Sequence, residues 1–106
     1  MKPEAQRIAI AEACGWKRDD SLFTRSQGWR GPQGQWYSPL PPDYLNSLDA
    51  MHEAEKTILG NQGTWTRYVA ELKVQSSKYG MPHFHLTAAQ RAEAFLRTLN
   101  LWTDES

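Results

Sequence analysis

The segment that most constrains the fold is the amphipathic stretch from Thr87 to Trp102, TAAQRAEAFLRTLNLW. Thr87 is suited to cap a helix that starts at Ala88, and Gln90 stands three residues later, in the position of a capping box. Asn100 is predicted to end the helix in a left-handed conformation. Apolar residues recur between these ends at steps of three and four: Ala88, Ala92, Phe95, Leu96 and Leu99. Because this spacing defines one helical face, the rest of the chain must bury that face.

The other side of this segment is polar. It carries Gln90, Arg91, Glu93 and Arg97, which we expect to form an ordinary solvated face. Leu101 and Trp102 are expected to fold back onto the body of the protein. The segment is therefore predicted to be a packing element and not the chemical centre of the molecule.

Two further helices are predicted. Pro3 to Cys14 (PEAQRIAIAEAC) has a proline in its first turn and Gly15 just beyond its end. Asn46 to Leu59 (NSLDAMHEAEKTIL) has Asn46 or Ser47 as its cap and Gly60 as its terminator. The apolar stripe of this second helix comprises Leu48, Met51, Ala54 or Glu55, and Ile58.

The stretch from Gln27 to Pro42 is dense in glycine, proline and aromatic residues. Glycine and proline at this density mark turns, so we predict a strand, loop, strand hairpin. Trp36 to Ser38 would form a brief strand after a turn from Gly31 to Gly34. Earlier in the chain, Lys17 to Ser21 is charged and turn-like, and Leu22 to Arg25 is suited to a short strand.

The stretch from Thr64 to Val74 (TWTRYVAELKV) fits two structures. Trp65, Tyr68, Val69 and Leu72 have helical spacing, whereas Tyr68, Ala70, Leu72 and Val74 alternate as in a strand. The β-branched and aromatic content favours the strand. Gln75 to Gly80 would then be a hairpin loop, and Pro82 to Leu86 the partner strand.

These elements predict a single domain spanning residues 1–106, of the α+β class. A chain of 106 residues buries about two-thirds of the surface that its unfolded form exposes, which is enough for one core. Because the strands come in hairpin pairs, the sheet is expected to be antiparallel. We therefore predict a compact α/β/α sandwich, a small antiparallel sheet with about three helices packed on it.

Two strings in the chain resemble the two signatures of the phage ABA sandwich domain family, a group of phage and prophage proteins. They are PDYLNSLDAMHEAEK (Pro42 to Lys56) and TAAQRAEAFLRTL (Thr87 to Leu99). The N-terminal helix ending in Ala13, Cys14, Gly15 and Trp16 is also similar to that family. The resemblance implies a layered α/β/α domain and a protein that acts in the cytoplasm of an infected bacterial cell. It implies no reaction and no catalytic residues.

Charge and cysteine content exclude several function classes. Lys plus Arg and Asp plus Glu each number 12, so the net charge is zero, which argues against nucleic-acid and membrane partners. No segment is long and apolar enough to span a bilayer. The single cysteine, Cys14, excludes an intrachain disulfide and a thiolate metal cluster.

The histidines suggest the one catalytic alternative. His83 and His85 share a face of the predicted strand, and His52 could complete the site of a metal-dependent enzyme. No third ligand has the right local spacing, so solvated histidines are the simpler interpretation. The chain also lacks a nucleophile elbow and a phosphate-binding loop. We predict no catalytic residue, no metal and no cofactor.

Binding is better supported, because cations and aromatic rings crowd the hairpin. The candidate ligand-binding residues are Arg25, Trp29, Arg30, Trp36 and Tyr37. Arginine can hold a phosphate in bidentate fashion, and bases can stack on aromatic rings. The alternative is that the two tryptophans only close the end of the sandwich and the arginines are solvated.

The sequence therefore predicts a small phage accessory protein without catalytic activity. It would bind a host factor, either an immune protein or a nucleotide signal that it sequesters, as a counter-defence protein. Self-association into a homo-oligomer would let two copies of the aromatic loop enclose a ligand. The alternative is a structural or regulatory component of a phage assembly.

Overall fold

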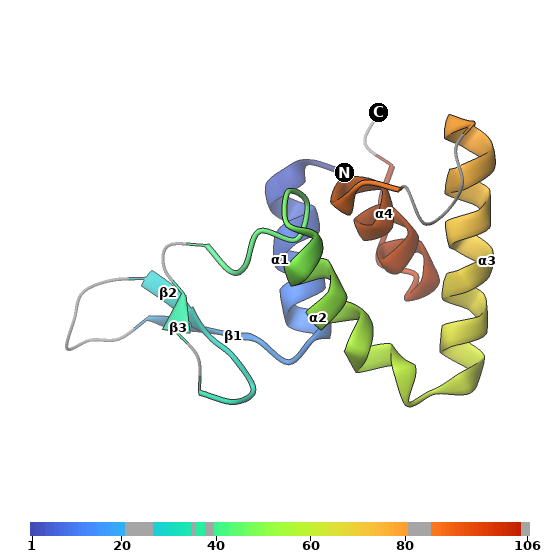
Figure 1. The fold of residues 1–106 in the computed structure, drawn as a ribbon. Helices are drawn as coiled ribbons and strands as arrows, with labels where there is room; N and C mark the ends of the chain where they lie inside the picture. The colour runs from blue at the N-terminus through green and yellow to red at the C-terminus, as the bar shows by residue number, and fades with distance from the viewer. Residues whose placement is uncertain (21–26, 35, 38–39, 81–85, 105–106) are drawn as a thin grey trace.

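The computed structural model describes residues 1–20, 27–34, 36–37, 40–80 and 86–104. Within these residues the elements are, in chain order, α1 (Pro3–Ala13), β1 (Lys17–Asp20), β2 (Gln27–Arg30), β3 (Trp36–Tyr37), α2 (Leu48–Leu59), α3 (Gln62–Tyr79) and α4 (Ala88–Thr98). Figure 1 shows the helices gathered in one body and the strands beside it. The predicted mixed α+β class is confirmed. No helix among these residues is long and apolar enough to cross a bilayer.

Three helices begin and end where their capping residues predict. Helix α4 starts after Thr87, whose hydroxyl accepts a hydrogen bond from the Gln90 amide at 3.2 Å and completes the capping box. Asn100 follows the helix with φ 60°, as expected for a left-handed cap. Ser47 caps α2 by accepting from the Ala50 amide at 3.2 Å. Helix α1 has Pro3 in its first turn and is followed by Gly15.

Helix α3 corrects the prediction of a strand from Thr64 to Val74 and of a loop from Gln75 to Gly80. Asn61 caps this helix by accepting from the Thr64 amide at 3.1 Å, and Gly80 ends it with φ 66°. The helix is favoured over the strand because it places Tyr68, Leu72 and Gln75 on one buried face, at steps of four and three. The expected partner strand falls largely on residues 81–85, outside the described residues.

The strands form one antiparallel sheet in the order β1-β2-β3. The predicted hairpin is confirmed, since β2 pairs with β3 across a turn in which the Gly34 amide donates to the Gly31 carbonyl at 3.0 Å. The prediction that Lys17 to Ser21 is turn-like is wrong for its first four residues, which form β1. This strand pairs with β2 and places Lys17 opposite Arg30. The strand expected at Leu22 to Arg25 lies outside the described residues.

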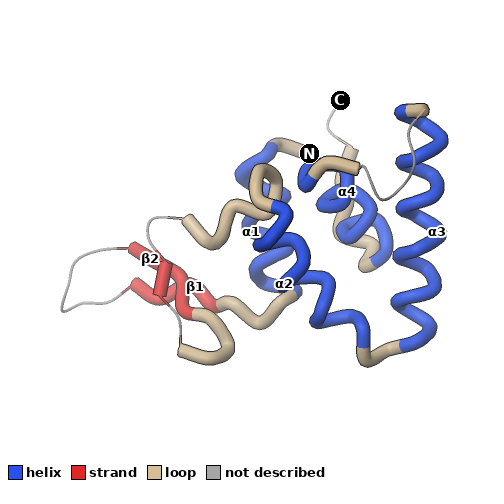
Figure 2. Tube along the Cα trace, viewed as in Figure 1, coloured by secondary structure: helices blue, strands red, loops and turns tan. Residues whose placement is uncertain are grey.

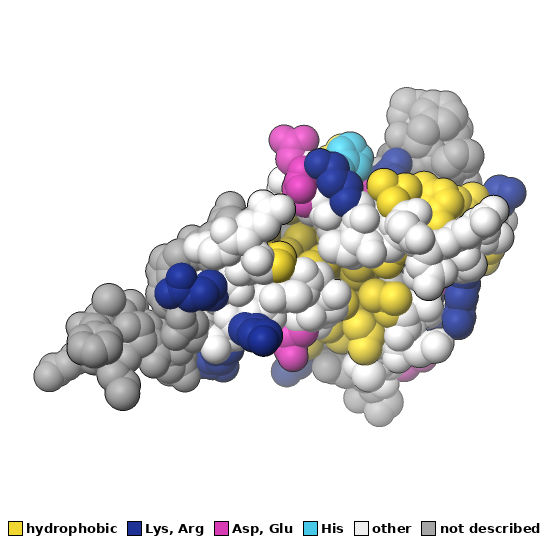
Figure 3. Space-filling view, turned by 90° about the horizontal axis from the view of Figure 1, so that it is seen from below, with side chains coloured by type: hydrophobic (Ala, Val, Ile, Leu, Met, Phe, Trp, Pro, Cys, Tyr) yellow, Lys and Arg dark blue, Asp and Glu magenta, His cyan; other side chains and the backbone are white. Residues whose placement is uncertain are grey.

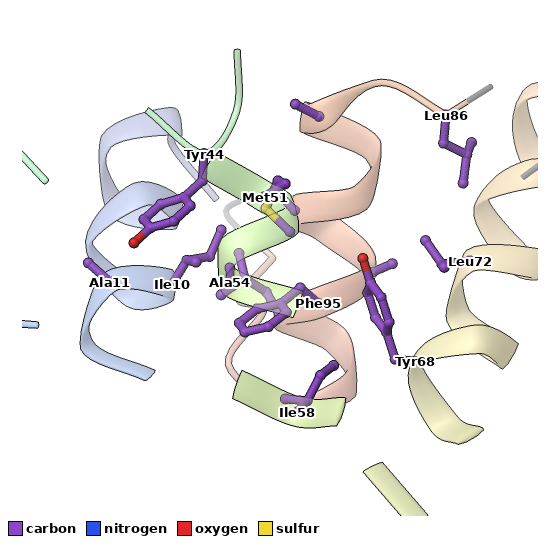
Figure 4. Close-up of a cluster of buried hydrophobic side chains, with 14 of the residues drawn as sticks. Ile10, Ala11, Tyr44, Met51, Ala54, Ile58, Tyr68, Leu72, Leu86 and Phe95 are labelled. Atoms are coloured by element: carbon purple, nitrogen blue, oxygen red, sulfur yellow. The ribbon is translucent and has the colours of Figure 1, made fainter. Parts of the chain in front are cut away.

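Helix α4 is the centre of the helical body, which we define as α1, α2, α3 and α4. It packs against each of the other three helices. Figure 4 shows side chains from all four helices converging on a common core. Phe95 of α4 is fully buried, and its ring meets that of Tyr68 edge-on with centroids 6.2 Å apart. The apolar face of the last helix is thus buried by the other helices.

The α+β class does not by itself show the predicted α/β/α layers. In Figures 1 and 2 the sheet lies to one side of the helical body, and the helices pack mainly on one another. The described residues therefore do not show helices covering both faces of the sheet. The sheet meets the helical body next to the end of α1 and the start of α2.

Candidate functional site

The structure describes the side chains of two of the five predicted ligand-binding residues, Trp29 and Arg30. Trp29 is only 5% exposed and belongs to the hydrophobic core, whereas Arg30 is exposed. Trp36 and Tyr37 lie opposite Arg30 and Trp29 in the strand register. Arg25 is outside the described residues. The buried position of Trp29 agrees with the interpretation that it closes the fold, and a shared ligand site for the five stays a prediction.

A different site lies where the sheet meets the helical body. It is a cleft of about 620 Å³, which we call the hairpin cleft, between the end of α1, the turn after β2 and the outer side of α2. Its lining comprises Cys14, Trp16, Pro32, Gln33, Pro42, Tyr44, Ser47, Asp49, Ala50, Glu53, Ala54, Lys56 and Thr57. Among the five residues predicted for binding, the two whose side chains the structure describes, Trp29 and Arg30, do not line it, although Pro32 and Gln33 belong to the same hairpin.

Backbone geometry brings the hairpin turn close to helix α1. Gly15 adopts φ 91°, a left-handed conformation that turns the chain directly after the helix. A Cβ built on Gly15 would lie 3.5 Å from Pro32 Cβ, so the turn touches the end of the helix. Trp16 and Tyr44 line the cleft and are themselves buried, which gives it an apolar aromatic wall.

The α2 rim of the hairpin cleft is acidic. Helix α2 contributes Asp49 and Glu53, both exposed, and one cation, Lys56. Lys56 Nζ is held 2.7 Å from Glu53 Oε1, so the ammonium group is already paired with a carboxylate. The cleft therefore presents one carboxylate in excess beside an apolar wall. An anionic group is disfavoured at this α2 rim, and a cationic or apolar group is favoured.

Cys14 lines the cleft but is not suited to nucleophilic chemistry. Burial raises the pKa of its thiol to about 11, and a hydrogen bond with Thr57 offsets part of that rise. The two atoms, Cys14 Sγ and Thr57 Oγ1, are 3.9 Å apart. Because the thiolate is the reactive form, this thiol stays protonated and unreactive near neutral pH.

Polar side chains inside the helical body overturn the prediction that α4 has a solvated face. Arg91 Nη1 lies 3.5 Å from Glu55 Oε1, and both side chains are largely buried between α2 and α4. Tyr68 of α3 lies beside them, and burial raises its pKa. Burial also raises the pKa of Glu55, with Arg91 opposing that rise. Arg91 is thus held in an ion pair within the body and does not face water.

A second polar cluster joins α3 to α4. Gln75 Nε2 and Arg97 Nε both donate to Glu93 Oε2, the latter at 3.0 Å. The Arg97 guanidinium also lies 4.9 Å from the centroid of the Trp102 ring, so the chain end folds back as expected. These residues line a shallow groove of about 400 Å³. Since they bond chiefly to one another, they hold the two helices in register.

Metal chemistry has no assembled site in the part of the chain that the structure describes. No group of three His, Cys, Asp or Glu side chains there is close enough to hold an ion. His52 is exposed on α2. His83 and His85 lie outside the described residues, so the metal-dependent alternative stays a prediction.

No protein-family model, no curated protein and no solved structure matches this chain. The resemblance to the phage ABA sandwich domain family stays a prediction for that reason. The site must therefore be interpreted from its own geometry.

Sequence reasoning missed the hairpin cleft because its walls come from three elements that are distant along the chain. One signal was available in the sequence. Glycines precede Trp16 and Pro32, and a glycine next to a bulky residue often marks a place where two chain segments approach closely.

Proposed function

We propose that this protein is a non-catalytic binding protein that holds a segment of another protein in the hairpin cleft. The observation that carries the proposal is the combination of a buried aromatic wall, Trp16 and Tyr44, with an acidic rim, Asp49 and Glu53. On the resemblance to phage proteins, the partner is a host protein and the role is that of a counter-defence accessory.

The chemistry of the cleft favours a protein segment over a nucleotide. The exposed Pro32, backed by the largely buried rings of Trp16 and Tyr44, offers apolar surface to an aliphatic or aromatic side chain of a partner. The unpaired carboxylate on the rim attracts lysine or arginine and repels phosphate. A partner segment with a basic residue next to an apolar one fits both features.

Two matched threonines allow a direct test. Thr57 lines the cleft, and its hydroxyl donates to the Ala54 carbonyl at 2.7 Å. Thr66 lies on α3 outside the cleft lining and donates in the same way to the Gln62 carbonyl at 2.9 Å. Both side chains are exposed. Thr57→Arg puts a bulky cation into the cleft, whereas Thr66→Arg makes the same chemical change elsewhere.

The measurement is affinity capture from a bacterial lysate with wild type and both variants, followed by calorimetric titration of the purified partner. We expect a protein that wild type and Thr66→Arg retain and that Thr57→Arg loses by a factor of ten or more in affinity, about 1.4 kcal/mol. If the two variants bound the partner with equal affinity, the cleft would not be the binding site. A retained phage component would instead favour the assembly role.

The nucleotide version of the function rests on the predicted residues Arg25, Trp29, Arg30, Trp36 and Tyr37, among which Arg30 is a described exposed cation. Titration with linear and cyclic nucleotides tests it. Trp29→Ala is not a useful variant, because Trp29 is buried and its loss would report on folding. Arg30→Glu is the better probe, since heat that disappears with this variant would support a nucleotide site on the sheet.

A further inference from the structure

Charged residues of both signs border the hairpin cleft, the cations on the sheet and the carboxylates on α2. Lys17 and Arg30 pair across β1 and β2 and lie on the same face of the sheet. Both cations are exposed. Lys17 directly follows Trp16, and Arg30 stands two residues before Pro32, and both Trp16 and Pro32 line the hairpin cleft. A cationic strand pair thus borders a cleft whose other rim carries Asp49 and Glu53.

Strand β1 continues away from the helical body after this pair, with Asp19 and Asp20 opposite Gly28 and Gln27 in the register. The end of the sheet that adjoins the cleft carries the exposed cations Lys17 and Arg30. Figure 3 shows Lys and Arg side chains on the sheet, apart from the hydrophobic side chains over the helices.

A surface with a basic half and an acidic half is complementary to itself. When a two-fold axis passes between the halves, the cations of each copy face the carboxylates of the other, and both contacts are satisfied at once. We propose that a second copy of this chain docks on this surface, so that the protein forms an isologous dimer through the hairpin cleft and the adjoining strands β1 and β2.

The shape and the net charge of the protein suit this pairing. The sheet projects from the helical body along a molecule of 49 × 33 × 22 Å, so one partner can contact the cleft and the strands together (Figure 1). The longer faces have room for the roughly 800 Å² per partner of a stable interface. The net charge is zero, so no overall repulsion opposes association.

The dimer does not depend on the proposed binding of a host protein. Its apolar centre would be the cleft wall, where Pro32 is exposed beside the buried rings of Trp16 and Tyr44. The charged pairs would fix the orientation of the two copies and make the association sensitive to salt. A captured partner would then compete with the second copy for the same surface.

Charge reversal gives a test that separates docking from folding. The strand variant is Lys17→Glu with Arg30→Glu, and the rim variant is Asp49→Lys with Glu53→Lys. Each variant alone places like charges at both contacts of the dimer. In a mixture, the acidic strands of one variant meet the basic rim of the other, and the basic strands meet the acidic rim. Both contacts are attractive again in the mixed dimer.

The measurement is size-exclusion chromatography with light scattering, with native mass spectrometry of the mixture and circular dichroism as the check on folding. We expect wild type at twice the 12.2 kDa of one chain, each variant at 12.2 kDa, and a mixed dimer from equal amounts of the two. The control, Lys2→Glu with Lys73→Glu, reverses two other exposed lysines and should remain dimeric.

Several results would overturn the dimer. They are a monomeric wild type at every concentration, a dimer that persists in both reversed variants, or folded variants that form no mixed species. A dimer without any captured partner supports the dimer and overturns the proposed function. A captured partner with a monomeric wild type supports the proposed function and overturns the dimer.

Discussion

The helical body and the sheet differ in how much of each is buried. In the body, α4 packs against all three other helices and its Phe95 and Leu96 are fully buried. The sheet has two strands of four residues and one of two. Its cations are exposed, and Trp29 is its described link to the core.

The two regions are also polar in different ways. Charged groups in the body, such as Glu55 and Arg91, are paired and largely buried between helices. The described cations of the sheet, Lys17, Arg18 and Arg30, are exposed at the surface. Buried pairs fix the arrangement of helices, whereas exposed charges steer and orient partners. In the proposed function, the body supplies stability and the junction with the sheet supplies recognition.

The largest expected effect is in the centre of the body. Phe95→Ala should lower the free energy of unfolding by about 3–5 kcal/mol, because it removes a fully buried ring that packs against Tyr68. The comparison variant in the sheet, Lys17→Ala, changes an exposed side chain and should stay within about 0.5 kcal/mol. Urea unfolding followed by circular dichroism measures both. Similar losses for the two variants would contradict the division into a stabilising body and a recognising junction.

The sequence was most informative where a local signal decides the structure. Capping residues act within one turn of their own position, so Ser47, Thr87 and Asn100 placed the helix ends correctly. Helix α3 had equally good signals in Asn61 and Gly80. They were outweighed by β-branched and aromatic content, which is a weaker guide because burial against neighbours overrides it.

Features that depend on distant contacts could not be predicted. The Arg91 side chain looks solvated along its own helix, and only the packing of α2 and α3 shows that it meets Glu55 and Tyr68. The hairpin cleft likewise needs α1, the hairpin turn and α2 to be placed relative to one another. Hydrophobic periodicity in the sequence describes one helix or strand at a time, so it cannot predict a site that forms between several elements.

An intermediate effect is expected at the link between the two regions. Gly15 has φ 91°, which an alanine adopts only with strain, so Gly15→Ala should cost about 1–2 kcal/mol of stability. The added Cβ would be 3.5 Å from Pro32, an ordinary contact, so the cost is conformational and not a clash.

Gly60 is the matched control for this variant. It has φ −74° and open space around the position of a Cβ, so Gly60→Ala should stabilise the protein by about 0.4–1 kcal/mol. Thermal unfolding of both variants checks the opposite signs. If Gly15→Ala were also stabilising, the turn between α1 and the sheet would not depend on a left-handed residue.

The smallest expected effect is a dependence on pH that belongs to the body alone. Burial raises the pKa of Glu55 above its usual 4.5, and Arg91 offsets part of that rise. The folded state therefore binds this proton more tightly than the unfolded state does. The stability that it contributes is fully present below pH 4.5 and is lost as the pH rises through the folded-state pKa.

Glu55→Gln removes this titration. The free energy of unfolding of wild type, relative to Glu55→Gln, should accordingly fall as the pH is raised above 4.5 in a series of urea titrations. Glu53→Gln, on the same helix with a side chain that is 71% exposed, is the control and should follow the wild-type profile. A relative stability of wild type that rises with pH would mean that the Arg91 ion pair outweighs burial. The charged pair of Glu55 and Arg91 would then stabilise the protein in its ionised form, as an exposed salt bridge does. The two regions would no longer differ in how their charged groups contribute.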